Sequence, residues 1–172
     1  MTDSDGSEYE LLCVVEIPKG SRNKYEYDEA LKAVKLDRFI SASVVYPTDY
    51  GFVPETLAVD GDPLDVLVCV SEPTFPGCVV PAKIVGLFKM ADEKGDDPHV
   101  LCVPCSDPGW NQIEDVDELP DLLRSEISHF FTVYKDLDAD RHSEVKGWGT
   151  RDEALEQVAE ARRRFLEAEV TA

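Results

Sequence analysis

Basic residues are scarce in this sequence, and long apolar runs are missing. Seventeen lysines and arginines stand against 36 aspartates and glutamates, which gives a formal net charge of -19 at pH 7. Such a charge repels nucleic acid and anionic membranes, but it attracts cations. No segment approaches the length of a membrane-spanning helix, and the acidic start lacks the features of a signal peptide. We therefore expect a cytoplasmic protein with no nucleic-acid or membrane partner.

Cysteine and histidine are also few, and their spacing disfavours several kinds of site. Five cysteines, an odd number, lie mostly in apolar segments, as buried thiols do in a reducing compartment. Cys102 and Cys105 form a C-x-x-C pair, but their segment has the pattern of a strand that enters a Pro/Gly turn. We therefore interpret this pair as structural. The three histidines have no paired spacing, so a zinc enzyme is disfavoured.

Short apolar or alternating segments fill the first hundred residues, and turn residues separate them. The candidate strands are 9–18, 24–29, 33–40, 65–70, 78–90 and 99–104, and the breaks include 46–51 and 92–98. Such close spacing is typical of a barrel. We expect a disordered leader over 1–8 and a single catalytic domain over 9–170. The predicted fold is α+β and mostly β, a five-stranded OB-like barrel, closed or highly curved, with two C-terminal helices packed outside.

The two helices are predicted from a change of period after residue 118. Apolar residues recur at helical spacing after Pro120, a residue that is favourable in a first turn. A second helix is expected to begin at Thr150, where Thr150 and Glu153 have the spacing of a capping box.

Three aspartates, Asp60, Asp62 and Asp65, directly precede the apolar run 66–70. They are equally typical of a solvated acidic turn, because the chain is acidic throughout. An EF-hand loop does not fit, since Leu64, Asp65 and Ser71 would occupy positions that need other residues. Phosphate-binding and dinucleotide-binding glycine motifs are absent. A magnesium site built from carboxylate oxygens remains the alternative to the solvated turn.

A second acidic group and a few basic residues extend this hypothesis. Asp92, Glu93, Asp96 and Asp97 surround a glycine turn between two apolar segments. Two-metal phosphoryl chemistry uses carboxylates from separate segments. Phosphate oxygens need donors, and the early strands offer them in Lys24, Arg38, Tyr46 and Tyr50.

Five segments, in this order, resemble the soluble inorganic pyrophosphatases of the magnesium-dependent, barrel-type class (family I). They are 14–28, 36–57, 60–66 (DGDPLDV), 89–97 and 129–137. The resemblance implies hydrolysis of pyrophosphate to two orthophosphates by a metal-activated water, with in-line attack and no covalent intermediate. It also implies several Mg²⁺ ions, with Mn²⁺ or Zn²⁺ as possible substitutes and Ca²⁺ as an inhibitor, and a homo-oligomer, commonly a hexamer.

The resemblance assigns roles to individual residues. Asp60, Asp65 and Asp97 would bind the first Mg²⁺, Asp65 would share a second, Asp92 and Asp97 would hold another, and Glu16 would reach an outer ion through water. The phosphates would be held by Lys24, Arg38, Tyr50, Tyr134 and Lys135. Glu26 and Tyr46 would line the cavity. Asp62 would act as general base, although Asp97 is the alternative.

One position departs from the family pattern. His99 stands where a lysine is expected, and two interpretations stay open: a cavity-lining residue and a plain strand residue. Histidine is mostly neutral near pH 7, so a phosphate contact there would be weaker or dependent on pH. Two other functions stay open. One is a barrel without catalysis that binds a small ligand or nucleic acid, although the charge opposes nucleic acid; the other is a magnesium phosphatase that acts on nucleotides or phosphate esters.

Overall fold

The computed structural model describes residues 1–2, 6 and 8–171. Of the leader predicted over 1–8, residues 3–5 and 7 lie outside the described residues. None of the helices in the described part of the chain combines the length and apolar character needed to span a membrane.

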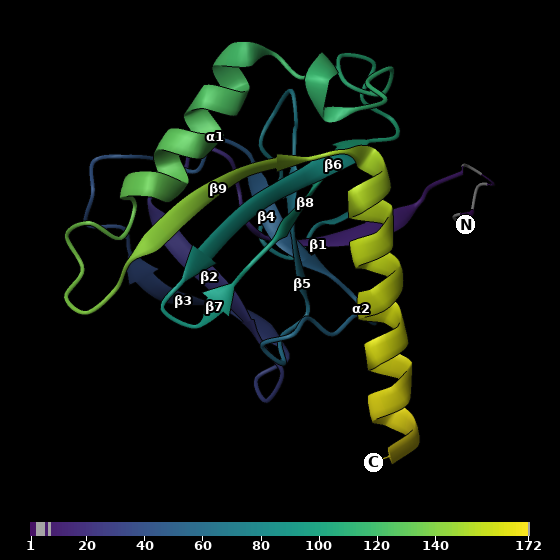
Figure 1. Ribbon diagram of the computed structural model, residues 1–172, viewed down its shortest axis with the longest axis horizontal. Coiled ribbons are helices and arrows are strands. Elements are labelled where there is room, and N and C mark those ends of the chain that lie inside the picture. Colours follow the sequence, from purple (N-terminus) through teal and green to yellow (C-terminus); the bar gives the residue numbers. More distant parts are fainter. Residues whose placement is uncertain (3–5, 7, 172) are drawn as a thin grey trace.

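Strands dominate the order of elements, and the two long helices come late (Figure 1). The strands are β1 (Leu11–Ile17), β2 (Asn23–Asp28), β3 (Ala33–Phe39), β4 (Asp49–Val53), β5 (Leu64–Val68), β6 (Val79–Asp92), β7 (Gly95–Asp96), β8 (His99–Pro104) and β9 (Ser143–Gly149). The helices are the short η1 (Val116–Glu118), α1 (Asp121–Val133) and α2 (Arg151–Thr171).

Within the described residues, five strands form a closed ring in the order β1, β4, β5, β8 and β6. The β1–β6 pairing closes the ring, and β5 and β8 are its parallel pair. The long β6 continues past the ring and pairs there with β7 and β9. This confirms the predicted five-stranded closed arrangement with two C-terminal helices.

The strand pattern did not predict which strands form the ring. β2 and β3 are strands as expected, but they form a separate two-stranded sheet. β4 lies in a region that we had interpreted mainly as a break, and β9 was not predicted at all. In β4, Asp49 is fully buried, and its carboxylate accepts hydrogen bonds from the backbone N–H of Lys19 and from Thr74. A turn-forming residue therefore belongs to a ring strand here because its charge is satisfied by hydrogen bonds.

Gly51 allows β4 to approach β1 closely. A Cβ at this position would lie 2.0 Å from the carbonyl oxygen of Val14, which is backbone on the neighbouring strand. Only glycine fits such an approach without a shift of one strand.

Each long helix covers its own apolar cluster. α2 begins with the predicted capping box: the Thr150 N–H donates to Glu153 Oε2 at 2.7 Å, and the Glu153 N–H donates to Thr150 Oγ1 at 3.3 Å. Its buried face belongs to the cluster that contains Val66 and Val100. α1 contributes Phe130 and Phe131 to a second cluster, which contains Leu67 and Leu101.

Strand alternation directs polar residues toward the second cluster. Side chains two apart on a strand share a face. Asp65 therefore shares a face of β5 with Leu67, and His99 shares a face of β8 with Leu101. The ring thus presents these two polar side chains on the side that α1 covers.

A paired contact joins the start of β1 to α2. Arg151 contacts Glu10 through two nitrogens, at 2.6 and 2.9 Å, and also donates to the carbonyl of Ile84. The Ile84 N–H donates to Glu10 at 2.8 Å, next to an irregularity in the β6–β8 pairing. Burial raises the pKa of Glu10, but the hydrogen bonds and the charge of Arg151 outweigh it and hold the pKa below its ordinary value. This contact links three distant segments of the chain.

Candidate active site

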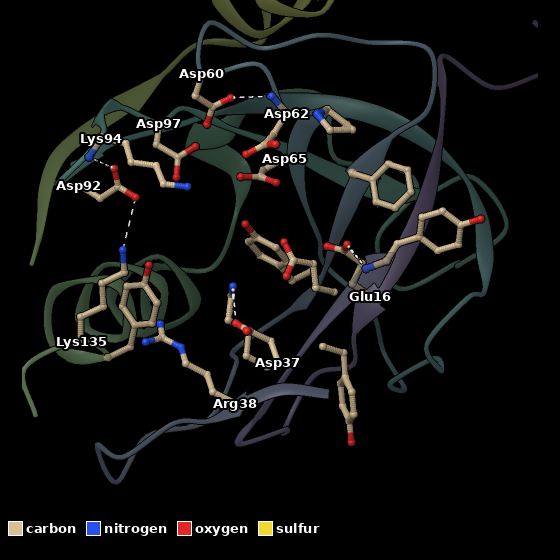
Figure 2. A pocket seen from close by; sticks show the side chains of 18 of the residues that line it. Glu16, Asp37, Arg38, Asp60, Asp62, Asp65, Asp92, Lys94, Asp97 and Lys135 are labelled. Atoms are coloured by element: carbon tan, nitrogen blue, oxygen red, sulfur yellow. Dashed lines mark hydrogen bonds and ion pairs between the residues drawn. The ribbon is translucent and has the colours of Figure 1, made fainter. Parts of the chain in front are cut away.

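A cavity of about 510 Å³ opens beside the ring, and charged side chains line most of it (Figure 2). Its walls come from β1 to β5, from the β6–β7 turn and from the segment that follows α1. The lining residues are Glu16, Lys24, Tyr25, Glu26, Tyr27, Glu29, Asp37, Arg38, Tyr50, Phe52, Asp60, Asp62, Pro63, Asp65, Asp92, Glu93, Lys94, Asp97, Tyr134, Lys135 and Arg141.

The first acidic group lines the cavity from the turn before β5. The Asp62 N–H donates to Asp60 Oδ1 at 3.0 Å, and the backbone carbonyl of Asp62 accepts a hydrogen bond from the Ala58 N–H. Asp60 and Asp62 are exposed, whereas Asp65 lies within β5 and is half-buried. The turn and the strand therefore bring the three carboxylates to one wall of the cavity.

The second acidic group reaches the same wall from the β6–β7 turn. Asp92 and Asp97 line the cavity, and the Asp97 N–H donates to the carbonyl of Met90 at 2.9 Å. Asp96 is exposed and pairs with Lys146 at 2.6 Å, and it does not line this cavity. Figure 2 shows Asp60, Asp65 and Asp97 close together, with Asp92 beside them.

Burial and crowding oppose ionisation of two acids here. Burial raises the pKa of Asp97 to about 6, and the neighbouring carboxylates of Asp65 and Asp92 add to this rise, while His99 opposes it. Burial likewise raises the pKa of Glu16 to about 7, although the N–H of Tyr27 donates to its carboxylate at 2.8 Å. A bound cation would relieve both effects.

Three of the basic side chains that line the cavity form ion pairs with carboxylates. Lys24 pairs with Asp37 at 3.0 Å, and Arg38 pairs with Asp138 at 2.6 Å. Figure 2 shows Arg38 across the cavity from Asp60, Asp65 and Asp97.

Lys135 is the most buried of these bases. Its side chain is 7% exposed, and its Nζ lies 3.3 Å from both Asp92 and Glu93. It therefore connects the second acidic group to the end of α1.

Three tyrosines reinforce this part of the cavity. Tyr50 and Tyr134 line it, and Tyr46 packs edge-on against Tyr50 with ring centroids 5.7 Å apart. Burial raises the pKa of all three phenols, so they remain neutral and can donate hydrogen bonds to an anion or a neighbouring group.

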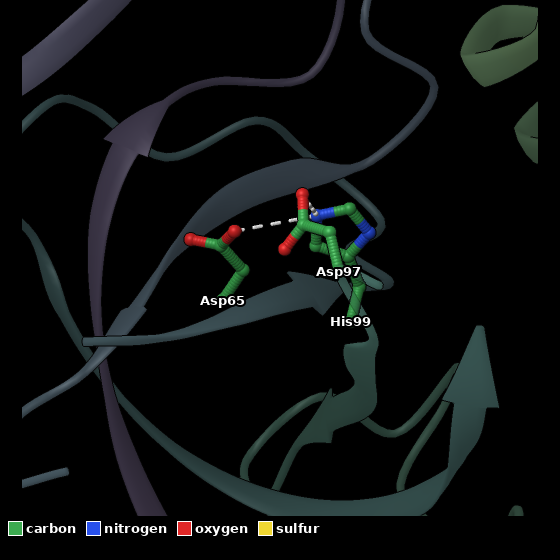
Figure 3. A group of neighbouring side chains, drawn as sticks. All are labelled: Asp65, Asp97 and His99. Carbon is green, nitrogen blue, oxygen red and sulfur yellow. Dashed lines mark ion pairs between the residues drawn. The ribbon is translucent and has the colours of Figure 1, made fainter. Parts of the chain in front are cut away.

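His99 lies behind the acidic wall rather than on the surface of the cavity. Its Nε2 is 3.4 Å from Asp65 Oδ2, 3.6 Å from Asp97 Oδ2 and 3.5 Å from the Tyr50 hydroxyl (Figure 3). Burial lowers the pKa of His99, but the carboxylates of Asp97 and Asp65 outweigh burial and raise it above its ordinary value.

Comparison with known proteins identifies the family. The family model described as inorganic pyrophosphatase matches residues 13–166. The chain belongs to the inorganic pyrophosphatase family. It is 54% identical over 154 residues to an inorganic pyrophosphatase of Methanosarcina acetivorans, with 90% of this chain and 91% of that protein covered.

Solved structures of inorganic pyrophosphatases also resemble this chain. The protein from Thermus thermophilus has a TM-score of 0.89 and 44% identity, with 95% of this chain and 97% of that chain covered. The protein from Coxiella burnetii has a TM-score of 0.88 and 41% identity, with coverages of 95% and 99%. The resemblance stated from the sequence motifs is therefore confirmed.

Most side chains to which that resemblance assigned roles meet at this cavity. Twelve of them line it: Glu16, Lys24, Glu26, Arg38, Tyr50, Asp60, Asp62, Asp65, Asp92, Asp97, Tyr134 and Lys135. Tyr46 and His99 are the exceptions, since each is almost fully buried and neither is among the lining residues. Tyr46 belongs to the second apolar cluster, and the His99 ring packs against Phe88 and Phe131 of that cluster, so both support the wall from behind.

The residues fit the metal dependence of the pyrophosphatase family. Ligand atoms of Asp65, Asp97 and His99 lie within 4.8 Å of one another, close enough to contact a single ion. Within the described residues, no lysine or arginine nitrogen lies within 4.0 Å of the Asp65 or Asp97 carboxylate. Apart from His99, the crowded acids thus have no direct cationic partner among the described residues, which suits a divalent cation.

Several charged residues of this site were not predicted. Asp37 and Asp138 hold Lys24 and Arg38, and Lys94 and Arg141 line the cavity. Asp138 and Arg141 follow directly after the motif 129–137, in a polar loop between α1 and β9. Only their position directly after this motif could have indicated Asp138 and Arg141 from the sequence, because residues in a loop follow no periodic pattern.

Proposed function

We propose that this chain hydrolyses inorganic pyrophosphate to two orthophosphates by in-line attack of a water molecule, with no covalent intermediate. The observation that carries the proposal is the arrangement of the cavity, in which Asp60, Asp65 and Asp97 face Arg38 and Lys135. Cations held by the acidic wall and bases on the opposite wall would contact opposite sides of a compact anion with two phosphates.

The acidic wall is proposed to hold several Mg²⁺ ions. Asp60, Asp65 and Asp97 would bind the first ion, Asp65 would share a second, and Asp92 and Asp97 would bind another. Glu16 would act at an outer ion through water. When bound, Mg²⁺ supplies positive charge that neutralises the substrate and lowers the pKa of the attacking water.

Asp62 is proposed as the general base. It lines the cavity, and its side-chain carboxylate accepts no hydrogen bond from another described residue, so both oxygens are available to take a proton from water. Asp97 is the alternative base, but it is also proposed to bind two of the ions. Those ions would occupy its lone pairs, which favours Asp62 as the base.

The opposite wall is proposed to hold the phosphates. Arg38 can donate two hydrogen bonds in a fixed geometry, while Lys24 and Lys135 act as point charges. Tyr50 and Tyr134 would donate their hydroxyl protons, and Glu26 would line the entrance beside Lys24. These groups are already in place, so little reorganisation accompanies the rise of charge on the leaving phosphate.

Phosphate release from pyrophosphate tests the proposal. We expect activity with Mg²⁺, weaker activity with Mn²⁺ or Zn²⁺, none with EDTA, and inhibition by Ca²⁺. Hydrolysis that persists in EDTA would contradict the mechanism. A panel of nucleotides and phosphate esters tests the phosphatase alternative, which would gain support if an ester were cleaved faster than pyrophosphate.

We also propose a homo-oligomer, with a hexamer expected from the family resemblance. Large apolar side chains remain exposed on the single chain, and they support burial against another copy. Examples are Phe39, Val59, Phe75 and Val79. Light scattering coupled to size-exclusion chromatography should give about six times the 19.2 kDa of one chain. A monomeric mass would refute the assembly and leave the hydrolysis proposal intact.

A further inference from the structure

We propose that His99 supplies a nitrogen ligand, through Nε2, to the ion held by Asp65 and Asp97, and that it shifts the metal preference of this site toward transition metals. This inference rests on the proposed function, because it concerns an ion of the same active site. It adds a ligand of a different chemical class to a set of carboxylates.

The position of one nitrogen is the first argument. His99 Nε2 lies 3.4 Å from Asp65 Oδ2 and 3.6 Å from Asp97 Oδ2. Two atoms that bind one ion at ~2.1 Å lie roughly 3.0–3.4 Å apart, depending on the coordination geometry. Figure 3 shows the ring nitrogen directed at the two carboxylates. The three groups therefore need little movement to surround an ion.

Packing fixes the ring in this orientation. The His99 ring stacks on Phe131 with centroids 5.1 Å apart, and on Phe88 with centroids 6.3 Å apart. The Tyr50 ring lies edge-on to it at 5.6 Å. Because the side chain is only 2% exposed, it has no room to turn away from the carboxylates.

The other ring nitrogen does not explain the burial of this side chain. His99 Nδ1 is buried and has no hydrogen-bond partner among the described residues. Leaving a polar atom buried in this way is unfavourable, whichever nitrogen carries the proton. The polar contacts of the ring therefore gather at Nε2 alone, beside Asp65 and Asp97.

The chemistry of imidazole gives the consequence for metal preference. Carboxylate oxygens suit Mg²⁺ and Mn²⁺, whereas imidazole suits Zn²⁺ and other later first-row metals. A site with two carboxylates and one imidazole should therefore favour Zn²⁺ over Mg²⁺ more strongly than the same carboxylates alone.

Electron paramagnetic resonance of bound Mn²⁺ tests this directly. Less than one equivalent of Mn²⁺ is added to the metal-free protein, and electron spin echo modulation reports nitrogen nuclei bonded to the ion. We expect ¹⁴N modulation in the wild type, and its replacement by ¹⁵N coupling in protein labelled with [¹⁵N]histidine. Absence of nitrogen coupling in the wild type would overturn the inference, and this measurement needs no substitution.

Variants assign the nitrogen to one residue. His99→Phe suits the aromatic surroundings, and His99→Gln keeps a polar side chain, so the two test the loss of imidazole in different ways. Both should lose the ¹⁴N signal. Control variants His129→Gln and His142→Gln change exposed histidines and should keep it. A signal that persists in a folded His99→Phe protein would also overturn the inference.

Metal affinity gives a second measurement, and activity separates the two proposals. In His99→Phe, the dissociation constant of Zn²⁺ should rise by about tenfold or more, and that of Mg²⁺ by a smaller factor. Equal changes in the two dissociation constants would contradict the role of His99 in metal preference.

If the wild type shows nitrogen coupling but does not hydrolyse pyrophosphate, the proposed function fails and the ligand assignment stands. If the wild type hydrolyses pyrophosphate but shows no nitrogen coupling, the proposed function stands and the ligand assignment fails.

Discussion

Arg38 Nη1 lies 2.6 Å from Asp138 Oδ2, although 100 residues separate the two in the sequence. Both side chains are less than one-fifth exposed, so solvent screens this ion pair only in part. Arg38 lines the cavity and Asp138 does not. Asp138 therefore holds the guanidinium from behind and directs it toward the cavity.

This relationship gives a prediction for substrate binding. Asp138→Asn should raise KM for pyrophosphate severalfold and change kcat less, because Arg38 loses the charge that orients it. Arg38→Lys should lower kcat/KM by about tenfold or more, since lysine cannot make the paired contacts of a guanidinium. Steady-state kinetics with Mg²⁺ measures both. The control is Asp136→Asn, an exposed acid two residues before Asp138; equal KM values for the two Asn variants would contradict the positioning role.

Asp62→Asn is expected to lower kcat by ~10²-fold or more, because the amide cannot accept the proton of the attacking water. The fold and metal binding should persist, since Asp62 is exposed and lies in a turn. Asp96→Asn is the matched control, because Asp96 is an exposed acid that pairs with Lys146 and does not line the cavity. An unchanged rate in Asp62→Asn would transfer the base role to Asp97.

Gly51→Ala should destabilise the protein. The added Cβ would lie 2.0 Å from the Val14 carbonyl oxygen, so β1 and β4 would have to separate. We expect the free energy of unfolding to fall by about 3 kcal/mol, as for other overpacked interiors. Chemical denaturation measures the change, and a variant as stable as the wild type would show that the two strands can separate at little cost.

Glu10→Gln should remove a contribution to stability that depends on pH. Because Arg151 holds the pKa of folded Glu10 below the ordinary 4.5, the contact stabilises the protein above about pH 4.5. That contribution is lost as the pH falls through the lower pKa of the folded state. At pH 7 the variant should be less stable by about 1 kcal/mol, given the partial exposure of the pair.

The difference between wild type and Glu10→Gln should therefore shrink as the solution becomes more acidic. Denaturation at several pH values measures it. Glu72→Gln, which changes an exposed acid that makes no ion pair with another described residue, should show no such trend. A difference that stays constant down to pH 3 would mean that Glu10 contributes by packing alone.

The sequence predicted the parts of this molecule that depend on local patterns. The helices followed from apolar spacing, and the capping box at Thr150 and Glu153 formed as expected. The ring strand β4 was missed because Asp49 and Gly51 are turn-forming residues by local preference. Their burial depends on partners far away in the chain, such as Thr74 and Val14.

The same distinction holds at the candidate site. The motifs indicated which acids and bases gather, and the cavity contains twelve of those side chains. Sequence could not indicate that Tyr46 and His99 lie behind the wall, because their direction depends on packing against α1. The carboxylates that hold Lys24 and Arg38 were missed for the same reason, since neither pairing follows a helical or strand period.

The chain order of these contacts has a consequence during synthesis on the ribosome. Lys135 follows its partner Asp92 by 43 residues, and Asp138 comes 100 residues after Arg38. A nascent chain that ends near residue 130 would already contain every carboxylate of the acidic wall, but it would lack both Lys135 and Asp138. The basic side of the cavity therefore cannot be completed until synthesis has passed residue 138.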